Sequence, residues 1–303
     1  MIGFISRLLD HLRGQSEDAV SAIYRSHVIE FHDFPSLERF HRNHFETNRE
    51  VEAELSRRGG QVEILRPWAN EPEPVSIETP ATFLDMYNFR ESFVDSLGLN
   101  ARQRQLFLAV QSRLGTGSQS ALLLEHRTAL HDQLNKTGLS VTSSHYVENR
   151  DDPHFQDMQR LTYADNSFDF VIHSDVLEHV PDYRTAVKEC LRVLKPGGML
   201  IYTAPFFPIA QSILRAEHAA DGSLIRHFPD EIHGDNLTGG ILAYHNFGWD
   251  LVEAHRADGF MSGYVEVCLS PSLGLYSSNC PIWTDAESGQ PGNMLPLVLI
   301  AQK

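Results

Sequence analysis

Apolar residues recur at helical spacing through the first sixty positions of the chain. Two helical faces result: Ala19, Val20, Ile23, Tyr24, His27 and Val28 form one, and Leu37, Phe40, His44, Val51 and Leu55 form the other. Arg57 and Arg58 followed by Gly59 and Gly60 make a good helix end. The pattern therefore predicts an N-terminal helical region over residues 1–65.

A further apolar stripe opens this region and consists of Phe4, Ile5, Leu8, Leu9 and Leu12. Charged residues interrupt it, so it lacks the core of a signal peptide. The stripe either touches a membrane surface or packs on the rest of the protein, and packing is the favoured interpretation.

Prolines at positions 67, 72, 74 and 80 follow the helical region. Proline fixes φ and lacks an N–H donor, so a cluster of prolines disfavours regular structure. Residues 66–82 are therefore expected to form an extended connector, with a second domain over residues 83–303.

From about residue 100 the pattern alternates between helices and strands. Helices are predicted over residues 100–114, 128–136 and 182–194, and strands over residues 121–124, 140–147, 168–172 and 199–204. Such alternation predicts a parallel sheet with helices on both faces. An antiparallel segment around Asp221-Gly222, a helix over 247–257 and strands over 264–269 and 295–301 complete the chain.

Composition narrows the range of partners. The chain has 25 basic and 40 acidic side chains among 303 residues, a formal charge of -15, which disfavours binding to nucleic acid through a basic surface. Three separated cysteines, Cys190, Cys268 and Cys280, indicate neither a disulfide framework nor a zinc knuckle. With no apolar run of membrane-spanning length, a cytoplasmic protein is expected.

One segment carries a family resemblance. Residues 161–206 read LTYADNSFDFVIHSDVLEHVPDYRTAVKECLRVLKPGGMLIYTAPF, with DNSFD, VLEHV and RVLKPGG in order. This segment resembles the core of class I S-adenosylmethionine-dependent methyltransferases of the type 11 group. The resemblance implies a Rossmann-like sheet, S-adenosylmethionine as cofactor, and a methyltransferase acting on a small molecule in specialised or cell-surface metabolism.

The resemblance extends to a narrower subgroup at both ends of residues 83–303. NFRESFVDSLGLNARQRQLF resembles the opening segment of that subgroup, and HFPDEIHGD resembles its late loop. The subgroup's opening segment usually carries paired cysteines of a small zinc ribbon. Asp95 and Ser96 stand in that neighbourhood here, so no metal is expected.

The resemblance also implies which residues hold the cofactor. Glu125 matches the acid near the methionine part, where it accepts from the ammonium group. Asp157 matches the acceptor for the adenine amino group, with the Met158 backbone beside the ring; a surface turn cap is the alternative for this aspartate. The end of the fourth strand, which lines the methyl-transfer site in the family, is His173, Ser174 and Asp175 here.

Two departures from the family pattern weaken this cofactor site. His145 stands where an acid usually binds the ribose hydroxyls, and a neutral imidazole accepts only one hydrogen bond. Arg127, Ala129 and His131 stand where glycines are expected. Arg127 either points outward or binds the cofactor carboxylate.

Histidines are the candidates for catalysis, because an acceptor proton has to be removed near neutral pH. His173 is a candidate because it lies at a strand end. His179 in LEHV is a second candidate for the site; the alternative for His179 is a structural role at the entrance of a helix. A late group of residues consists of His227, His233, Asp235 and His245. Metal binding suits these residue types, but the irregular spacing favours a substrate-facing lid, with His233 or His245 as base.

Two rival functions stay open. The departures at His145 and the glycine-free turn are also typical of a methyltransferase-fold protein that no longer methylates, either a binding partner or a His/Asp-dependent catalyst of another reaction. The N-terminal helices are alternatively an oligomerisation or docking module.

Overall fold

The computed structural model describes residues 19–57, 59–69, 71–77, 89–147, 149–234, 240–275, 280–281, 293–294 and 297–303. The predicted stripe from Phe4 to Leu12 and the domain boundary at Phe83 lie outside these residues, and the division into a helical region, a connector and a second domain stays a prediction. Of the helices in the described part of the chain, none combines the length and apolar character that crossing a bilayer requires.

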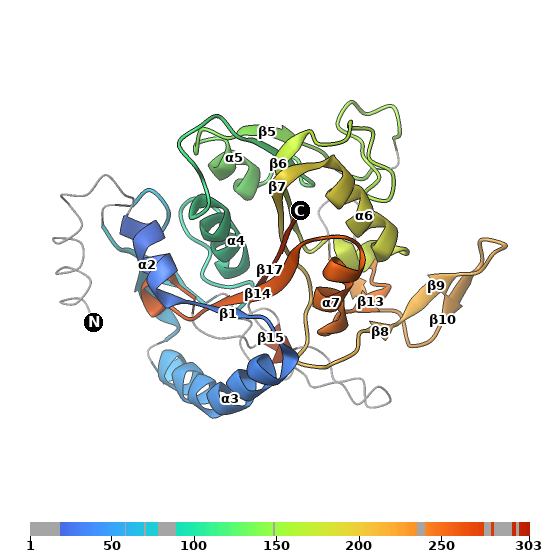
Figure 1. The fold of residues 1–303 in the computed structure, drawn as a ribbon. Coiled ribbons are helices and arrows are strands. Elements are labelled where there is room, and N and C mark those ends of the chain that lie inside the picture. Colours follow the sequence, from blue (N-terminus) through green and yellow to red (C-terminus); the bar gives the residue numbers. More distant parts are fainter. Residues whose placement is uncertain are drawn as a thin grey trace.

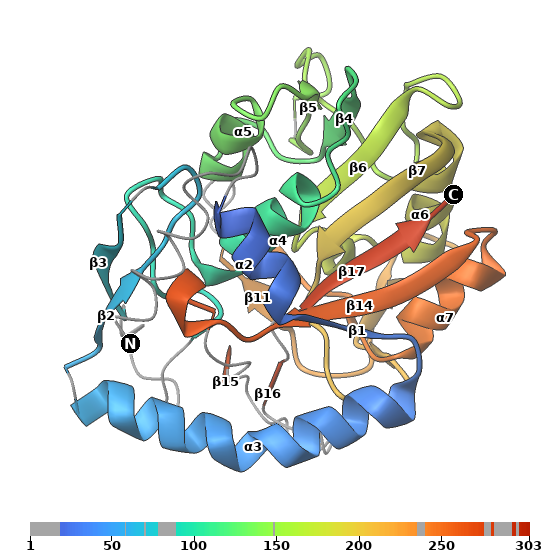
Figure 2. The ribbon, with the colours of Figure 1, turned by 60° about the vertical axis from the view of Figure 1, so that its left-hand side comes forward.

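A seven-stranded sheet forms the centre of the molecule (Figures 1 and 2). Across the sheet the strands are β1 (Val28–Phe31), β14 (Ser262–Cys268), β17 (Leu297–Gln302), β7 (Leu194–Thr203), β6 (Phe168–Ser174), β4 (Ser120–Leu123) and β5 (Ser140–Ser143). The last four run parallel, while β17 is antiparallel to both neighbours and β1 is antiparallel to β14. The predicted α/β sheet, parallel over four neighbouring strands, is confirmed.

The order of the parallel strands reverses between β4 and β6. From β4 the chain passes outward to β5, and it then returns to the other side for β6 and β7. In an open parallel sheet, the loops at such a reversal separate and leave a crevice outside the carboxyl ends of the strands. The crevice of this sheet therefore lies at the ends of β4 and β6.

Helices cover both faces of the sheet, as the alternating pattern predicts. On one face, α4 (Ala101–Gln111), α5 (Ala129–Leu134) and α2 (Ala19–His27) contribute to a single apolar cluster with β4, β7 and β17. On the other face, α6 (Tyr183–Val193) and α7 (Asp250–Ala257) pack with β6, β7 and β14. The buried residues of α6 are spaced at helical intervals, which is why its apolar stripe faces the sheet.

The N-terminal region differs from the predicted helices at one point. Its first helix, α2, ends at His27, and Val28 begins strand β1, which pairs with β14 through Phe31 and Val265. The sequence VIEF is rich in residues that favour strands, and the open edge of β14 supplies a backbone partner. The second helix, α3 (Phe34–Arg57), ends where the glycine pair predicts.

The proline-rich connector is not wholly irregular. Strands β2 (Gln61–Ile64) and β3 (Glu73–Ser76) pair antiparallel, with Glu63 opposite Pro74. Strand β2 lies in the predicted helical region and β3 in the predicted connector; the connector is extended there as expected, but residues 73–76 form regular structure, which the prolines were expected to prevent. A two-stranded ribbon has two open edges, and proline is tolerated where its missing N–H faces such an edge.

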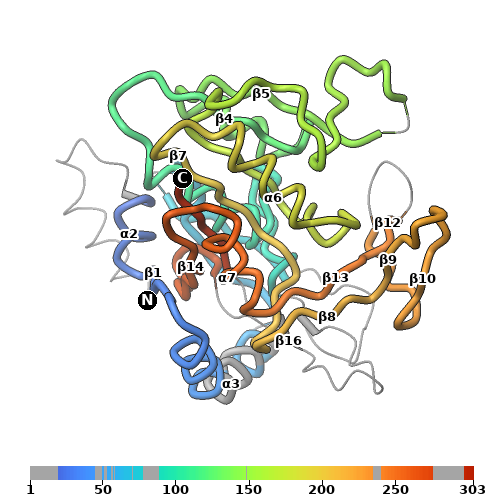
Figure 3. Tube along the Cα trace, turned by 45° about the vertical axis from the view of Figure 1, so that its right-hand side comes forward, coloured from blue at the N-terminus to red at the C-terminus, as the bar shows by residue number. Residues whose placement is uncertain are grey.

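Several short strands lie between β7 and α7 in the chain. The hairpin of β9 (Ala216–His218) and β10 (Leu224–Arg226) turns at Asp221-Gly222 as predicted and projects from the molecule in Figure 3. Two further ribbons pair β8 (Ile213–Leu214) with β13 (His245–Asn246), and β11 (Ile232–His233) with β12 (Ile241–Leu242). Two 3-10 helices, η1 (Leu177–His179) and η2 (Pro271–Leu273), and the pair β15 (Cys280–Pro281) and β16 (Asn293–Met294) complete the elements.

Candidate active site at the carboxyl ends of the parallel strands

Polar side chains gather where the parallel strands end. Glu125 follows β4 by two residues, Ser174 ends β6 with Asp175 next in sequence, and Thr203 ends β7. These positions surround the crevice where the strand order reverses. The family resemblance places Glu125, Ser174 and Asp175 here, and the structure brings these three positions to the same edge of the sheet.

Asp175 is the centre of a buried ion network. Its two oxygens accept from Arg90 Nη1 and Nη2 at 2.6 Å each, and Thr203 Oγ1 donates to it at 2.8 Å. Arg102, at the start of α4, lies 3.3 Å from the same carboxylate and also donates to Glu91 at 2.8 Å and to Ser174. Burial would raise the pKa of Asp175, but Arg102 and Arg90 outweigh burial and hold this pKa well below its usual value.

Glu125 is an acceptor with unused capacity. Its Oε1 is buried and has no hydrogen-bond partner among the described residues. Burial raises the pKa of Glu125, while Thr128 and Arg102 act in the opposite direction. A buried carboxylate oxygen without a donor is costly, and an ammonium group in the crevice would supply the missing donor. This part of the site fits the methionine end of the expected cofactor.

The turn after β4 keeps a backbone conformation that glycine favours, although it contains no glycine. Arg127 adopts a φ of 58° and its side chain is exposed, so it does not fill the crevice. Thr128 caps α5 by accepting from the backbone N–H of His131. Ala129 and His131 then lie within the first turn of α5, where the normal helical φ has no need of glycine.

Four imidazole rings lie close together where the family has its ribose-binding acid. The His126 ring stacks on His154 with centroids 3.9 Å apart, and His145 and His131 lie 5.2 and 5.9 Å from it. His145 Nε2 lies 3.2 Å from Asp152 Oδ1. Burial lowers the pKa of His126, and the neighbouring histidines act in the same direction. His145, from which the sequence analysis expects a single hydrogen bond to the ribose hydroxyls, lies within this cluster, and its role in binding ribose stays a prediction.

The predicted adenine-binding residues adopt a local turn. Asp157 Oδ1 accepts from the backbone N–H of Gln159 at 2.9 Å, as an aspartate in a turn commonly does. The Met158 side chain is buried in the core, which leaves only its backbone for a ligand. The role of both residues in binding adenine stays a prediction.

His173 is enclosed by the protein. It has no exposed surface, stacks on Tyr202 at 4.4 Å between centroids, and faces the core beneath α6 and α7. Burial lowers the pKa of His173 to about 3. The structure therefore does not bring this predicted catalytic residue to the crevice, because β6 turns alternate side chains to opposite faces of the sheet.

The two other predicted catalytic histidines occupy different surroundings. His245 is buried between Tyr183 and Phe247, with ring centroids at 4.9 and 5.7 Å, and burial lowers its pKa to about 4. His233 lies beside His179, with ring centroids 5.0 Å apart. Burial would lower the pKa of His233, but Glu178 and Glu231 raise it to about 10. The structure thus joins His233 to His179 and separates both from His245.

Several residues of the site lie in segments that resemble the family, but the sequence analysis gave them no role. Arg90, Glu91 and Arg102 come from the segment before β4, far from the strand ends in sequence. Glu178 is fully buried beside His179, within the LEHV motif. The pairing of an acid with a histidine in this motif could have indicated a joint role for both.

The neighbourhood expected for zinc-ribbon cysteines is held by other interactions. Asp95 accepts from the backbone N–H groups of Leu97 and Leu99 at 3.0 Å and pairs with the buried Arg104 at 3.2 Å. Ser96 Oγ donates to Glu73 at 2.7 Å. A buried ion pair and a cap therefore fix this segment in place of metal ligands.

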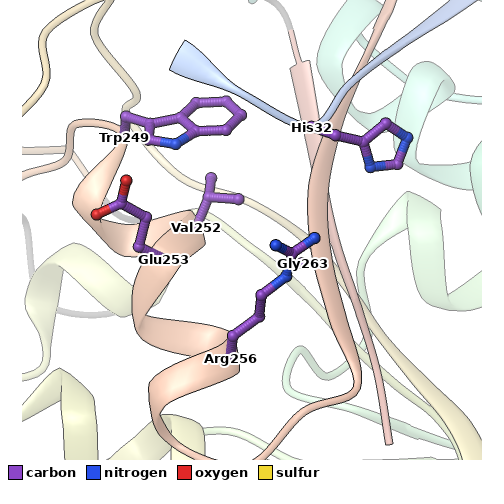
Figure 4. Close-up of a pocket in the computed structure, with 6 residues that line it drawn as sticks. All are labelled: His32, Trp249, Val252, Glu253, Arg256 and Gly263. Carbon is purple, nitrogen blue, oxygen red and sulfur yellow. The ribbon is translucent and has the colours of Figure 1, made fainter.

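A separate hollow lies at the other end of the sheet (Figure 4). It is lined by His32, Trp249, Val252, Glu253, Arg256 and Gly263, and its volume is about 100 Å³. Gly263 lies on β14, and strands β17 and β7 separate β14 from β6, so the hollow is remote from the crevice at the ends of β4 and β6. It is also smaller than a typical pocket for a cofactor-sized ligand.

Comparisons with known proteins support the resemblance for the central segment. Residues 114–202 match a family model described as a methyltransferase domain. Over 62 residues the chain is 42% identical to a demethylmenaquinone methyltransferase of Staphylococcus haemolyticus. The matched segment makes up 20% of this chain and 26% of that protein. The chain thus spans about a quarter of the length of this relative.

Solved structures give the same type of match. A Mesorhizobium loti S-adenosylmethionine-dependent methyltransferase is 19% identical, covering 69% of this chain and 100% of that one, with a TM-score of 0.44. A Burkholderia thailandensis 1,6-didemethyltoxoflavin-N1-methyltransferase, solved with bound S-adenosylhomocysteine, is 17% identical to this chain. The match covers 67% of this chain and 78% of that one, with a TM-score of 0.38.

Proposed function

We propose that this chain transfers a methyl group from S-adenosylmethionine to a small-molecule acceptor. The observation that carries the proposal is the buried carboxylate oxygen of Glu125, at the switch point of the sheet, which has no hydrogen-bond partner in the part of the chain that the structure describes. Its segment lies within the residues that match a methyltransferase domain. When bound, the cofactor supplies an electrophilic methyl group on its sulfonium.

The residues of the crevice have distinct proposed roles. Glu125 accepts hydrogen bonds from the cofactor ammonium group, and His145 accepts one from a ribose hydroxyl. The ion network of Arg90, Arg102 and Asp175 fixes the ends of β6 and α4, so the crevice is preorganised rather than formed on binding.

We place the acceptor next to η1, because this helix begins two residues after Asp175 and carries His179. His233 packs on that histidine, which puts one of the predicted catalytic residues at the acceptor. The specialised or cell-surface role of the product, the cytoplasmic setting, the exclusion of nucleic acid and an oligomer formed through the N-terminal helices stay predictions.

Cofactor affinity tests the proposal. S-adenosylhomocysteine should bind the purified chain with micromolar affinity in a calorimetric titration. Because a hydrogen bond to a charged group contributes about 1.5–3 kcal/mol, Glu125→Gln should weaken binding roughly 10- to 100-fold. Glu253→Gln, at an exposed acid on α7, is the matched control and should bind as the wild type does.

Absence of heat at high micromolar cofactor would contradict the proposal. That result would favour the rival function, a methyltransferase-fold protein that no longer methylates. Equal affinity of wild type and Glu125→Gln would instead show that the cofactor binds without the proposed ammonium contact.

A further inference from the structure

Three side chains converge beside the crevice without bonding to one another. His179 Nε2 and His233 Nδ1 each lie 3.7 Å from Glu178 Oε1, and all three atoms lie within 4.8 Å of one another. A separation of 3.7 Å is too long for a hydrogen bond. Two ligands of a tetrahedral zinc ion are about 3.4 Å apart, given bond lengths near 2.1 Å. The spacing therefore resembles a ligand set more closely than a bonded cluster.

The two histidines turn their other ring nitrogens to fixed acceptors. His179 Nδ1 lies 2.9 Å from the Leu242 carbonyl, and His233 Nε2 lies 2.8 Å from Glu231 Oε1. Both partners only accept, so these ring nitrogens donate. The other ring nitrogen of each histidine, the one nearer Glu178, is the atom that would bind a metal ion, and the ion would displace any proton held there. A histidine that binds metal typically donates its other N–H to a carbonyl or a carboxylate in this way.

Glu178 is the residue with the clearest need for a partner. Its side chain has no exposed surface, and neither carboxylate oxygen has a hydrogen-bond partner among the described residues. A buried carboxylate is costly unless it is paired or coordinates a metal. The nearer nitrogen of each histidine ring lies 3.7 Å from this carboxylate, so a cation between the three groups would satisfy all of them.

The surrounding backbone holds these side chains in place. The ribbon of β11 and β12 pairs His233 with Ile241, which brings the Leu242 carbonyl to His179. The backbone N–H of Tyr244 donates to the Glu178 carbonyl at 2.8 Å. Glu231 is itself anchored by Arg215 and Asn246, each 3.2 Å from its Oε2. The outer partners are therefore as well ordered as the proposed ligands.

We propose that Glu178, His179 and His233 bind one divalent transition-metal ion, with zinc as the representative of the class. Two imidazoles and one carboxylate suit zinc and its first-row neighbours better than calcium or magnesium, which prefer oxygen ligands. Three protein ligands leave one coordination position open. That an acceptor oxygen occupies this position rests on the proposed methyl transfer, whereas the metal site itself does not.

Metal binding to the full chain tests the proposal. After treatment with a chelator, the wild type should take up one equivalent of Zn²⁺ in equilibrium dialysis with elemental analysis. Glu231→Gln keeps all three ligands and alters only the outer partner of His233, so its affinity should fall 10- to 100-fold. His233→Gln removes a ligand and should lose more. His227→Gln is the control, because His227 also pairs with a glutamate, Glu217 at 2.9 Å, but is exposed.

The outcomes separate this proposal from the proposed function. Co²⁺ in place of Zn²⁺ should give the visible absorption of a four-coordinate site in wild type and not in His233→Gln. Glu125→Gln should keep its metal, and His233→Gln should keep its affinity for S-adenosylhomocysteine. Failure of the wild type to bind Zn²⁺, or equal uptake by all variants, which would indicate an adventitious ion only, would overturn the metal site. If His233→Gln does not fold, Glu231→Gln decides the question.

Discussion

Arg127 holds a conformation that costs a non-glycine residue roughly 1–2 kcal/mol, because Cβ crowds the following carbonyl in the left-handed region. Glycine removes this strain but loses about 0.5–1 kcal/mol through the entropy of the unfolded chain. We therefore expect Arg127→Gly to raise the free energy of unfolding by roughly 0.5–1 kcal/mol, measured by urea denaturation.

The control for this effect is Arg127→Ala, which removes the same exposed side chain but keeps Cβ. Its free energy of unfolding should stay within about 0.5 kcal/mol of the wild type, as is usual for surface positions. Equal stabilisation by both substitutions would show that the arginine side chain, and not backbone strain, is unfavourable.

Single residues of the site could be predicted where a strand ends in a recognisable motif. Glu125, Ser174 and Asp175 lie at the crevice because the carboxyl ends of parallel strands share one edge. The pairing of Arg90 with Asp175 could not be predicted, because the two residues are 85 positions apart and no periodic pattern links them. The prediction for His173 failed for a different reason. His173 does lie at the end of β6, but side chains alternate along a strand, and this one faces the core and not the crevice.

Among the helices, α6 has the simplest start. Asp182 Oδ1 accepts from the backbone N–H of Thr185 at 3.1 Å, and Oδ2 accepts from its hydroxyl at 2.6 Å. Asp182→Ala should lower the free energy of unfolding by about 1 kcal/mol, because the first turn loses its acceptor. Asp182→Asn keeps an acceptor and should differ by only a few tenths. Thermal and urea unfolding measure both, and equal losses would argue against the cap.

Helices with a side-chain cap at their first turn could be predicted closely, as for α4, α5 and α6. Their boundaries follow from local chemistry: Asn100, Thr128 and Asp182 each accept from the backbone of the first turn. Strand β1 and the β2–β3 ribbon could not be predicted in the same way. Each is four residues long, and its pairing depends on a partner that only the folded chain supplies.

For the whole molecule, buried histidines predict loss of stability in acid. Burial lowers the pKa of His173 to about 3 and that of His255 to about 4, from an unfolded value near 6.5. Below pH 6.5 the unfolded chain binds protons that the folded chain does not, so the free energy of unfolding falls with pH. Each histidine should contribute a loss of roughly 2 kcal/mol between pH 6.5 and 5.

Urea denaturation of wild type and His173→Phe across this pH range isolates the effect. Phenylalanine keeps an aromatic ring against Tyr202 and cannot bind a proton, so the slope against pH should fall by up to about 1.4 kcal/mol per pH unit. Identical slopes for wild type and His173→Phe would mean that His173 is not neutral in the folded protein.

Strand β1 also affects how copies of this protein can associate. Unpaired backbone groups on a long outer strand recruit other chains, and β14, with seven residues, would be such a template if β1 did not cover it. The margins of the sheet are instead β1 and β5, each four residues long. Pairing of this sheet with the sheet of a neighbouring molecule is thus disfavoured at both edges. Loss of residues 28–31 by proteolysis would uncover β14 as an edge on which a second copy of the sheet can pair.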